Sequence, residues 1–356
     1  MRFELTDLHR LRDLPVDDII DVRAPSEFAE DHIPGALSLP VLSDAERAEV
    51  GTIYVQEDRF LARKIGAALV AKNAAAHLQG PLADRSGAWR PLVYCWRGGQ
   101  RSGSFASILD QIGWRVQVLD GGYRSYRRLV VDLLYKVPLP YRFVLIDGGT
   151  GTGKTHLLRH LSKKGAQVID LEGLAQHRGS NFGSLAGGQP AQKGFESQLA
   201  QLLVDFSTDK PIFLEGESNA IGSLLIPPTV WAAMGQSEVI TVEAPVAARA
   251  KHLLTAYPDL THDLDLLLSR IEALRSYHPR DQIDAWRRLA QDGAYATLAE
   301  ALIDGHYDPR YRRSLRHRLP LGTVTLEALS EGDMDRAADA ILALVPERKA
   351  ILGSAG

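Results

Sequence analysis

The sequence predicts an α/β protein with two domains in series, each built on a parallel sheet. Its 356 residues are long for one domain and comfortable for two. In both halves, short apolar runs of strand length alternate with stretches of helical spacing, as in parallel sheets covered by helices. Pro138 and Pro140 favour an extended linker between the halves. We therefore expect domains at residues 1–137 and 138–356.

The composition sets limits on function. A hydrophobic content of 45% and a charged content of 24% are ordinary for globular proteins and exclude wholesale disorder. The net charge of −3 excludes a generally basic nucleic-acid-binding protein, so any nucleic-acid contact must be a local patch. The chain begins without an apolar signal segment, and no apolar run approaches the roughly 18 residues of a membrane helix. We expect a soluble cytoplasmic protein with no membrane partner.

Three buried strands and two helices are expected in the first domain. Apolar runs predict the strands at residues 18–22, 91–94 and 115–119, and helical spacing predicts the helices at 57–75 and 102–112. The second domain should open with a strand, a glycine-rich turn and a helix, followed by further strands and a mostly helical C-terminal part. The strands are predicted at residues 142–147, 167–169, 211–214 and 238–242. The helix after the glycine-rich turn is predicted at 154–163, and the mostly helical part at 258–305.

A phosphate-binding loop is predicted between the first strand and helix of the second domain. Residues 148–155, GGTGTGKT, match the pattern Gly-x4-Gly-Lys-Ser/Thr in the required strand-to-helix context. The glycines let backbone amides point inward and form an anion nest at the start of the helix. The predicted phosphate-binding residues are Gly148, Gly151, Gly153, Lys154 and Thr155. The motif indicates a polyphosphate and does not identify a nucleotide.

Thr155 is also a predicted ligand of Mg²⁺, which usually takes a carboxylate at the end of a neighbouring strand. Glu215 and Glu217 both follow the strand at 211–214, and the sequence does not choose between them. Either carboxylate also fits the simpler role of capping the strand end in water.

Cys95 is the only cysteine, so an internal disulfide and a CxxC redox pair are excluded. It follows a predicted strand and precedes a loop with two arginines and two glycines, whose predicted active-site residues are Arg97, Gly98, Gly99 and Arg101. Loop amides, the start of the next helix and the arginines would lower the thiol pKa and produce a nucleophilic thiolate. A buried structural cysteine is the alternative. We predict a catalytic Cys95.

Two further groups of polar residues are candidates. The loop after the strand at 167–169 should line the cleft at the strand ends, with Arg178 as an anion contact; hydrogen bonding within the loop is the alternative. Its candidates are Asp170, Glu172, His177, Arg178 and Ser180. The basic segment 306–318 mixes cations with aromatic rings and fits contact with a nucleic acid, although most charge runs are solvated faces. Its candidates are Arg310, Tyr311, Arg312, Arg313 and Arg316.

The first domain resembles the rhodanese family. The resemblance rests on residues 21–23 (DVR), 27–28 (EF) and 32–36 (HIPGA), and on the loop at 95–102. Asp31 stands where the family normally has glycine. The resemblance implies that Cys95 carries sulfur or selenium, and it leaves the acceptor open.

The whole chain, from about residue 10 to 345, resembles the tRNA 2-selenouridine synthase family. A rhodanese-like domain precedes a P-loop domain, and the block HRGSNFG at 177–183 is the most specific feature. The resemblance implies action on 2-thiouridine at wobble position 34 of lysine, glutamate and glutamine tRNAs. Geranyl diphosphate would first alkylate the sulfur, and selenium from selenophosphate, carried on Cys95 as an S-selanyl adduct, would then replace the S-geranyl group.

The resemblance implies that the protein has no prosthetic group. It also implies two partners: tRNA, contacted around its anticodon, and a supply of selenophosphate. Two other interpretations remain open at this point. One is an ATP-dependent kinase of a small molecule with a sulfurtransferase domain. The other is a non-catalytic regulator whose first domain binds a partner.

Overall fold

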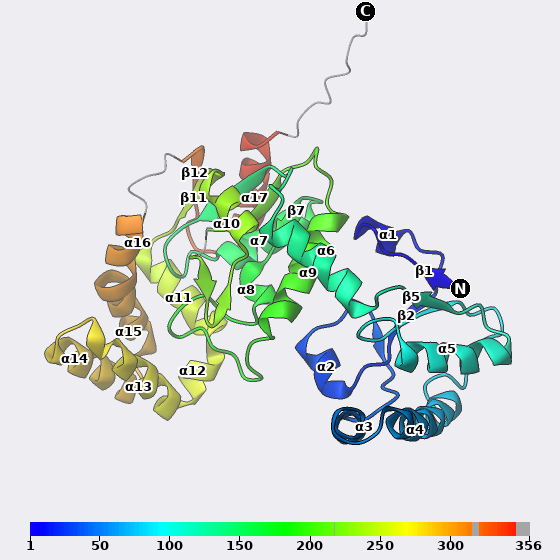
Figure 1. Cartoon of the computed structure of the whole chain (residues 1–356). Helices are drawn as coiled ribbons and strands as arrows, with labels where there is room; N and C mark the ends of the chain where they lie inside the picture. The colour runs from blue at the N-terminus through cyan, green and yellow to red at the C-terminus, as the bar shows by residue number, and fades with distance from the viewer. Residues whose placement is uncertain (217, 315–319, 347–356) are drawn as a thin grey trace, which may run out of the picture. The chain divides into compact units, whose positions relative to one another are not determined.

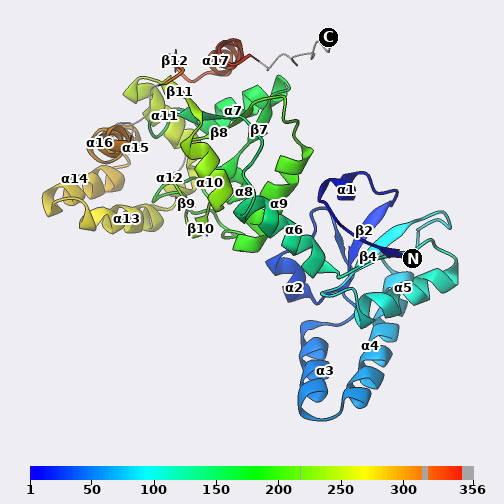
Figure 2. The ribbon, with the colours of Figure 1, turned by 45° about the horizontal axis from the view of Figure 1, so that its top comes forward.

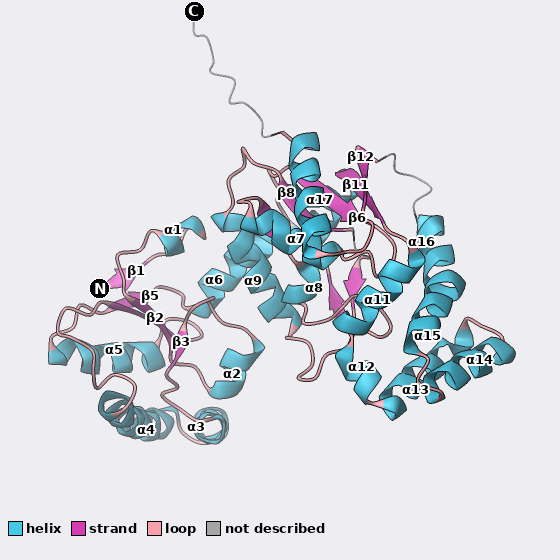
Figure 3. Cartoon of the chain, turned by 180° about the vertical axis from the view of Figure 1, so that it is seen from behind, coloured by secondary structure: helices cyan, strands magenta, loops and turns pink. Residues whose placement is uncertain are grey.

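The computed structural model describes residues 1–216, 218–314 and 320–346. Its contacts divide the chain into two compact units: residues 1–138 together with 190–205, and residues 139–189 together with 206 onward. Each unit contains a five-stranded parallel sheet with helices on its faces (Figure 1 and Figure 3). The predicted α/β class with two parallel sheets is therefore confirmed. In the described part of the chain, no helix is both long enough and apolar enough to cross a membrane.

The sheet of the first unit has the strand order β1-β5-β4-β2-β3, and all of its pairings are parallel. The central strands confirm the prediction, whereas β1 and β3 have two residues each and are too short to leave a periodic pattern. The strands are β1 (Arg2–Phe3), β2 (Asp18–Asp21), β3 (Leu37–Ser38), β4 (Pro91–Tyr94) and β5 (Gln117–Leu119).

Seven helices surround this sheet: α1 (His9–Arg12), α2 (Pro25–Glu30), α3 (Asp44–Gln56), α4 (Arg59–Gln79), α5 (Gln100–Ile112), α6 (Tyr123–Tyr135) and α9 (Gln192–Asp205). The helix predicted from residue 57 begins at Arg59 because the Asp58 side chain caps it, accepting a hydrogen bond from the Leu61 amide. Helices α3 and α4 form a hairpin, seen clearly in Figure 2.

Helix α9 lies far along the chain from the rest of the first unit. Glu196 accepts a hydrogen bond from Arg127 on α6, and the Ser197 hydroxyl donates to Asp31 at 3.0 Å. The segment at 190–205 falls inside the stretch that we assigned, as a whole, to the second domain. Its packing depends on these long-range polar partners, which no local pattern reveals.

The sheet of the second unit is also parallel throughout, with the order β12-β11-β6-β8-β7. Its strands are β6 (Phe143–Asp147), β7 (Gln167–Ile169), β8 (Ile212–Glu215), β11 (Glu238–Glu243) and β12 (Gly322–Thr325). The four predicted strands are confirmed to within one residue, and β12 was not predicted. A small antiparallel pair joins β9 (Ala220–Ile221) to β10 (Leu224–Leu225).

Helix α7 (Lys154–Lys163) follows β6 as predicted, and α17 (Glu331–Leu344) packs beside it over the core of the sheet. The helical stretch at 258–305 is confirmed and encloses a separate apolar cluster around Trp286. The remaining elements are α8 (Leu171–Leu174), α10 (Pro228–Gly235), α11 (Val246–Ala256), α12 (Pro258–His262), α13 (Leu264–Glu272), η1 (Ala273–Ser276), α14 (Arg280–Gln291), α15 (Tyr295–Leu302), η2 (Ile303–Tyr307) and α16 (Asp308–Ser314).

Candidate functional site

The thiol of Cys95 lies at the carboxyl end of β4, where the loop to α5 begins. Cys95 is 4% exposed, and the Ser102 hydroxyl donates a hydrogen bond to Sγ at 3.2 Å. Burial raises the thiol pKa, but hydrogen bonds from Ser102 and from the Arg97 amide, with the charge of Arg101, outweigh it. The net effect is a pKa below the ordinary value. The environment therefore favours the nucleophilic thiolate form.

Two glycines allow the loop to close on Cys95. Gly98 and Gly122 have φ values of +63° and +58°, in the left-handed region that disfavours side chains. A Cβ atom on Gly122 would lie 2.2 Å from the Cys95 carbonyl oxygen, and one on Gly98 would lie 2.4 Å from the Leu119 carbonyl oxygen. The loop can therefore wrap the thiol only because these positions carry no side chain.

The two arginines of the loop have different surroundings. Arg101 forms an ion pair of 2.7 Å with Glu27, which also pairs with Arg47. Arg97 is exposed and contributes its backbone amide to the thiol. Gly99 is exposed and precedes the first residue of α5. Arg101 therefore acts from a fixed position, and Arg97 has a cationic side chain open to solvent.

The predicted phosphate loop has the expected geometry. Gly151 and Gly153 have φ values of +83° and +76°. The Lys154 ammonium donates to the Gly148 carbonyl at 2.9 Å, which holds the side chain back over the loop. Gly151, Gly153, Lys154 and Thr155 line one pocket. A polyphosphate would meet these amides and this ammonium at the start of α7.

Thr155 contacts a carboxylate other than the two predicted. Its hydroxyl donates to Glu172 at 3.1 Å, and Glu172 lines the same pocket. Glu215 is fully buried and accepts a hydrogen bond from the Leu171 amide at 3.0 Å. Burial, together with the charges of Asp170 and Glu172, raises the pKa of Glu215 well above its usual range. Glu217 lies outside the described residues.

The loop at 177–183 provides one wall of the same pocket. Arg178 forms a two-pronged ion pair with Asp259, at 2.8 and 3.1 Å, and its guanidinium lies over the Tyr257 ring. The Ser180 hydroxyl lies 3.3 Å from that of Tyr257. Both Arg178 and Ser180 line the pocket. Arg178 is therefore positioned beside the phosphate loop with one carboxylate partner already bound.

The other candidates of this segment hold the backbone in place. His177 is buried, and its Nδ1 accepts a hydrogen bond from the Gly179 amide at 3.1 Å. Burial and the nearby charges of Arg270 and Arg178 lower its pKa, so it is neutral. Asp170 caps α8 by accepting from the Gly173 amide at 2.6 Å. These contacts correspond to the loop-stabilising alternative.

A second, apolar pocket adjoins the phosphate pocket. Thr150, Leu253, Tyr257 and Tyr307 line both pockets. The other walls of the apolar pocket include Phe182, Leu254, Leu260, Leu267, Leu298 and Leu302. Sequence reasoning missed this pocket because the helices between α11 and η2 meet the loops of Thr150 and Phe182 only in the folded chain. An anionic group in the phosphate pocket would therefore lie beside apolar walls.

Comparison with known proteins identifies both domains of the chain. A rhodanese-like domain model matches residues 4–129, and a model of the tRNA 2-selenouridine synthase AAA domain matches residues 141–265. The tRNA 2-selenouridine synthase of Bdellovibrio bacteriovorus is 32% identical over 348 residues, covering 84% of this chain and 89% of that protein. The chain belongs to the tRNA 2-selenouridine synthase family. The member from Marinobacter nauticus is 32% identical, over 86% of this chain and 90% of that protein. The member from Aeromonas salmonicida is 38% identical, over 70% of this chain and 67% of that protein.

This member of the tRNA 2-selenouridine synthase family also carries a buried ion pair behind its phosphate loop. Arg249 on α11 pairs with Asp308 at 2.6 Å, and its Nε donates to the Thr150 carbonyl at 2.9 Å. Both side chains are nearly buried. Arg249 carries no sequence signal of its own, so its support of the loop was not predicted.

The basic segment is only partly described. Arg310 is exposed, and its guanidinium lies 4.0 Å from the centre of the Tyr277 ring, which is 55% exposed. Tyr311 is half-buried, and burial and the adjacent Asp147 raise its pKa. Its hydroxyl therefore faces the end of β6. Outside the described residues lie the side chains of Arg312 and Arg313 and all of Arg316.

Proposed function

We propose that this chain is an enzyme that modifies tRNA by transferring selenium to a thiolated uridine. In the finer form of the proposal, it converts 2-thiouridine to 2-selenouridine at wobble position 34 of lysine, glutamate and glutamine tRNAs. The substrates are geranyl diphosphate and selenophosphate. Family membership supports the coarse activity, because its relatives carry the name tRNA 2-selenouridine synthase.

The observation that carries the finer proposal is the junction of the anionic and apolar pockets. Four residues line both, so one ligand can place a diphosphate on the loop at 148–155 and a hydrocarbon chain between Phe182 and Leu302. A nucleotide would place its polar base against walls made of leucine side chains and tyrosine rings. The chemistry of these walls supports a prenyl diphosphate over ATP.

The residues of the phosphate pocket also fit a magnesium ion. The Thr155 hydroxyl and the Glu172 carboxylate are oxygen donors 3.1 Å apart, the kind of ligand that Mg²⁺ prefers. We propose this pair as its protein ligands. When bound, the ion would neutralise charge on the leaving diphosphate.

Each site would supply one part of the reaction. In the first step, the thiouridine sulfur attacks the first carbon of the geranyl group, and the carbon–oxygen bond to diphosphate breaks. Lys154 stabilises the negative charge that leaves. In the second step, the selenide-level selenium of selenophosphate attacks carbon 2 of the base, the bond from carbon 2 to the alkylated sulfur breaks, and geranyl thiol leaves, while water takes the phosphoryl group as phosphate. We propose that the Cys95 thiolate takes part in this transfer; an S-selanyl adduct on Cys95 would in addition need a two-electron oxidant to form and a thiol to release its selenium.

The tRNA would contact the basic segment at 306–318. Arg310 and the exposed Tyr277 ring offer a cation and a stacking face side by side. We propose Arg310 for phosphate contact and Tyr277 for base stacking, together with Arg312, Arg313 and Arg316. Tyr311 would serve instead to hold α16 against the end of β6.

Ligand binding to the purified full chain tests the pocket. We expect geranyl diphosphate to bind more tightly than ATP or inorganic diphosphate. Thr261 lines the apolar pocket and is partly exposed, so Thr261→Trp should fill the pocket and weaken geranyl diphosphate binding about tenfold while leaving inorganic diphosphate binding unchanged. Tight ATP binding with phosphoryl transfer to a small molecule would instead support a kinase. Equal weakening of both ligands would contradict a tail in this pocket.

A further inference from the structure

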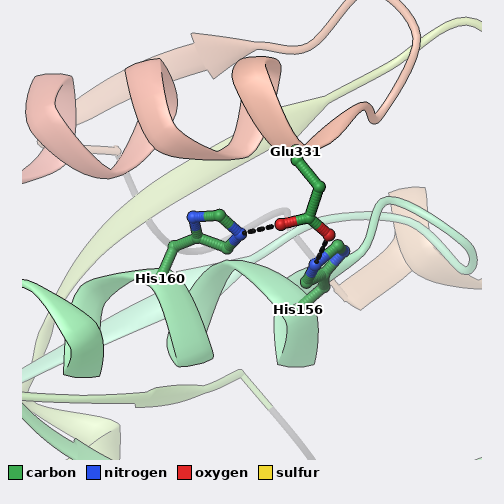
Figure 4. Close-up of side chains that lie close together, drawn as sticks. All are labelled: His156, His160 and Glu331. Atoms are coloured by element: carbon green, nitrogen blue, oxygen red, sulfur yellow. Dashed lines mark hydrogen bonds and ion pairs between the residues drawn. The ribbon is translucent and has the colours of Figure 1, made fainter.

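Two histidines of the phosphate-loop helix meet a glutamate of α17, the helix packed against it. His156 and His160 are four residues apart on α7 and therefore point from the same face. Glu331 is the first residue of α17 and lies opposite them (Figure 4). Its two oxygens lie 2.9 Å from Nε2 of His156 and 3.0 Å from Nε2 of His160.

We propose that His156, His160 and Glu331 bind a divalent transition-metal ion of the zinc type. The potential ligand atoms all lie within 4.8 Å of one another. Donor atoms of a tetrahedral zinc site, about 2.0–2.2 Å from the ion, are about 3.4 Å apart. The Glu331 side chain is 73% exposed and can therefore rotate to admit the ion. Two imidazoles and a carboxylate form a donor set that zinc uses, with a fourth position left for water or another ligand.

The surroundings of His160 favour a metal ligand. Its side chain is 7% exposed, so its orientation is restricted, and Oδ1 of Asp335 lies 3.8 Å from its Nδ1. Metal-binding histidines commonly direct their second nitrogen toward a carboxylate, which orients the ring and increases its basicity. Lys164 pairs with Asp335 at 2.9 Å and balances its charge.

The position of the ion gives it a role in the fold. His156 directly follows Thr155 and lines the phosphate pocket, whereas Glu331 begins a different helix. An ion bound by both would join α17 to the helix that carries the phosphate loop. It would also add positive charge beside an anion-binding pocket, so zinc and a polyphosphate should increase each other's affinity.

Metal binding is tested on the full chain with Cys95 alkylated, so that no thiol competes. We expect one zinc ion per chain in equilibrium dialysis, and a cobalt(II) derivative with visible bands of tetrahedral coordination. Glu331→Gln and His160→Ala should each weaken zinc binding by about 10- to 100-fold. His262→Ala is the matched control, because His262 is an exposed histidine on α12, and it should bind zinc as the unaltered chain does.

Thermal unfolding separates this proposal from simple hydrogen bonding between the helices. With zinc, the unaltered chain should gain several degrees in Tm, and Glu331→Gln should gain none. If the three groups only hold the helices together, both variants lower Tm by the same amount with zinc and with a chelator, and the proposal is wrong. Zinc binding unchanged in both variants would place the ion elsewhere and also overturn it.

Discussion

Replacing Ser102 by alanine removes the hydroxyl that donates to Sγ of Cys95 at 3.2 Å. A hydrogen bond to a charged group contributes about 1.5–3 kcal/mol, and one pKa unit corresponds to about 1.4 kcal/mol. Its loss would therefore raise the thiol pKa by about one to two units. The same hydroxyl lies 3.3 Å from the Gly99 carbonyl, which competes for its single proton. We expect the lower value, a rise of about one unit.

The assay is the rate of iodoacetamide alkylation as a function of pH. Cys95 is the only cysteine, so the full chain reports one thiol. The unaltered chain should show a midpoint below the usual cysteine value of about 8.5, and Ser102→Ala should shift it upward. Ser107→Ala is the matched control, because Ser107 lies on the same helix and donates to the Gly103 carbonyl, at 2.9 Å. An unchanged midpoint in Ser102→Ala would refute this account of the thiolate.

Three further predictions concern stability. Gly122→Ala places a Cβ atom 2.2 Å from the Cys95 carbonyl oxygen. We expect the free energy of unfolding, measured in urea, to fall by about 3 kcal/mol. In the control Gly113→Ala, where φ is positive and the space is open, it should fall by about 1 kcal/mol. Arg249→Ala leaves the Asp308 carboxylate buried and unpaired, and should lower the free energy of unfolding by about 3–5 kcal/mol. The double variant Arg249→Met with Asp308→Leu should restore part of this loss. An Arg249→Ala chain as stable as the original would contradict this account. Burial, with the charges of Arg310 and His278, lowers the pKa of His306 to about 4. The folded chain therefore holds His306 in its neutral form, and protonation favours the unfolded chain. About 3 kcal/mol of the free energy of unfolding present above pH 6.5 should be lost by pH 4. His306→Asn should show a weaker dependence of stability on pH.

The sequence predicted those parts of the molecule that depend on neighbouring residues. Strand β4 and helix α7 were predicted at the bounds the structure gives, because an apolar run and a glycine-rich start are local signals. The phosphate loop and the thiol loop followed for the same reason. Strand β12 was missed because GTVT is short and carries little apolar pattern.

Features built from distant residues escaped prediction. Glu172 contacts Thr155, 17 residues away, and no spacing rule selects it over Glu215. The apolar pocket and the pairing of Arg249 with Asp308 arise only when α11 packs against the C-terminal helices. Tyr311 looked like a stacking residue within a basic run, but helix packing turns its hydroxyl toward Asp147. Pattern alone cannot distinguish an exposed aromatic ring from one that faces inward.

Nucleoside mass spectrometry of tRNA tests the division of labour between the two sites most directly. Cells lacking the gene would be supplied with the unaltered chain, with Cys95→Ala or with Lys154→Ala. We predict 2-selenouridine with the unaltered chain, accumulation of S-geranyl-2-thiouridine without selenium with Cys95→Ala, and neither product with Lys154→Ala. Equal loss of both nucleosides in the two variants would contradict the division, and the absence of any selenium- or geranyl-containing nucleoside with the unaltered chain would contradict the proposed function.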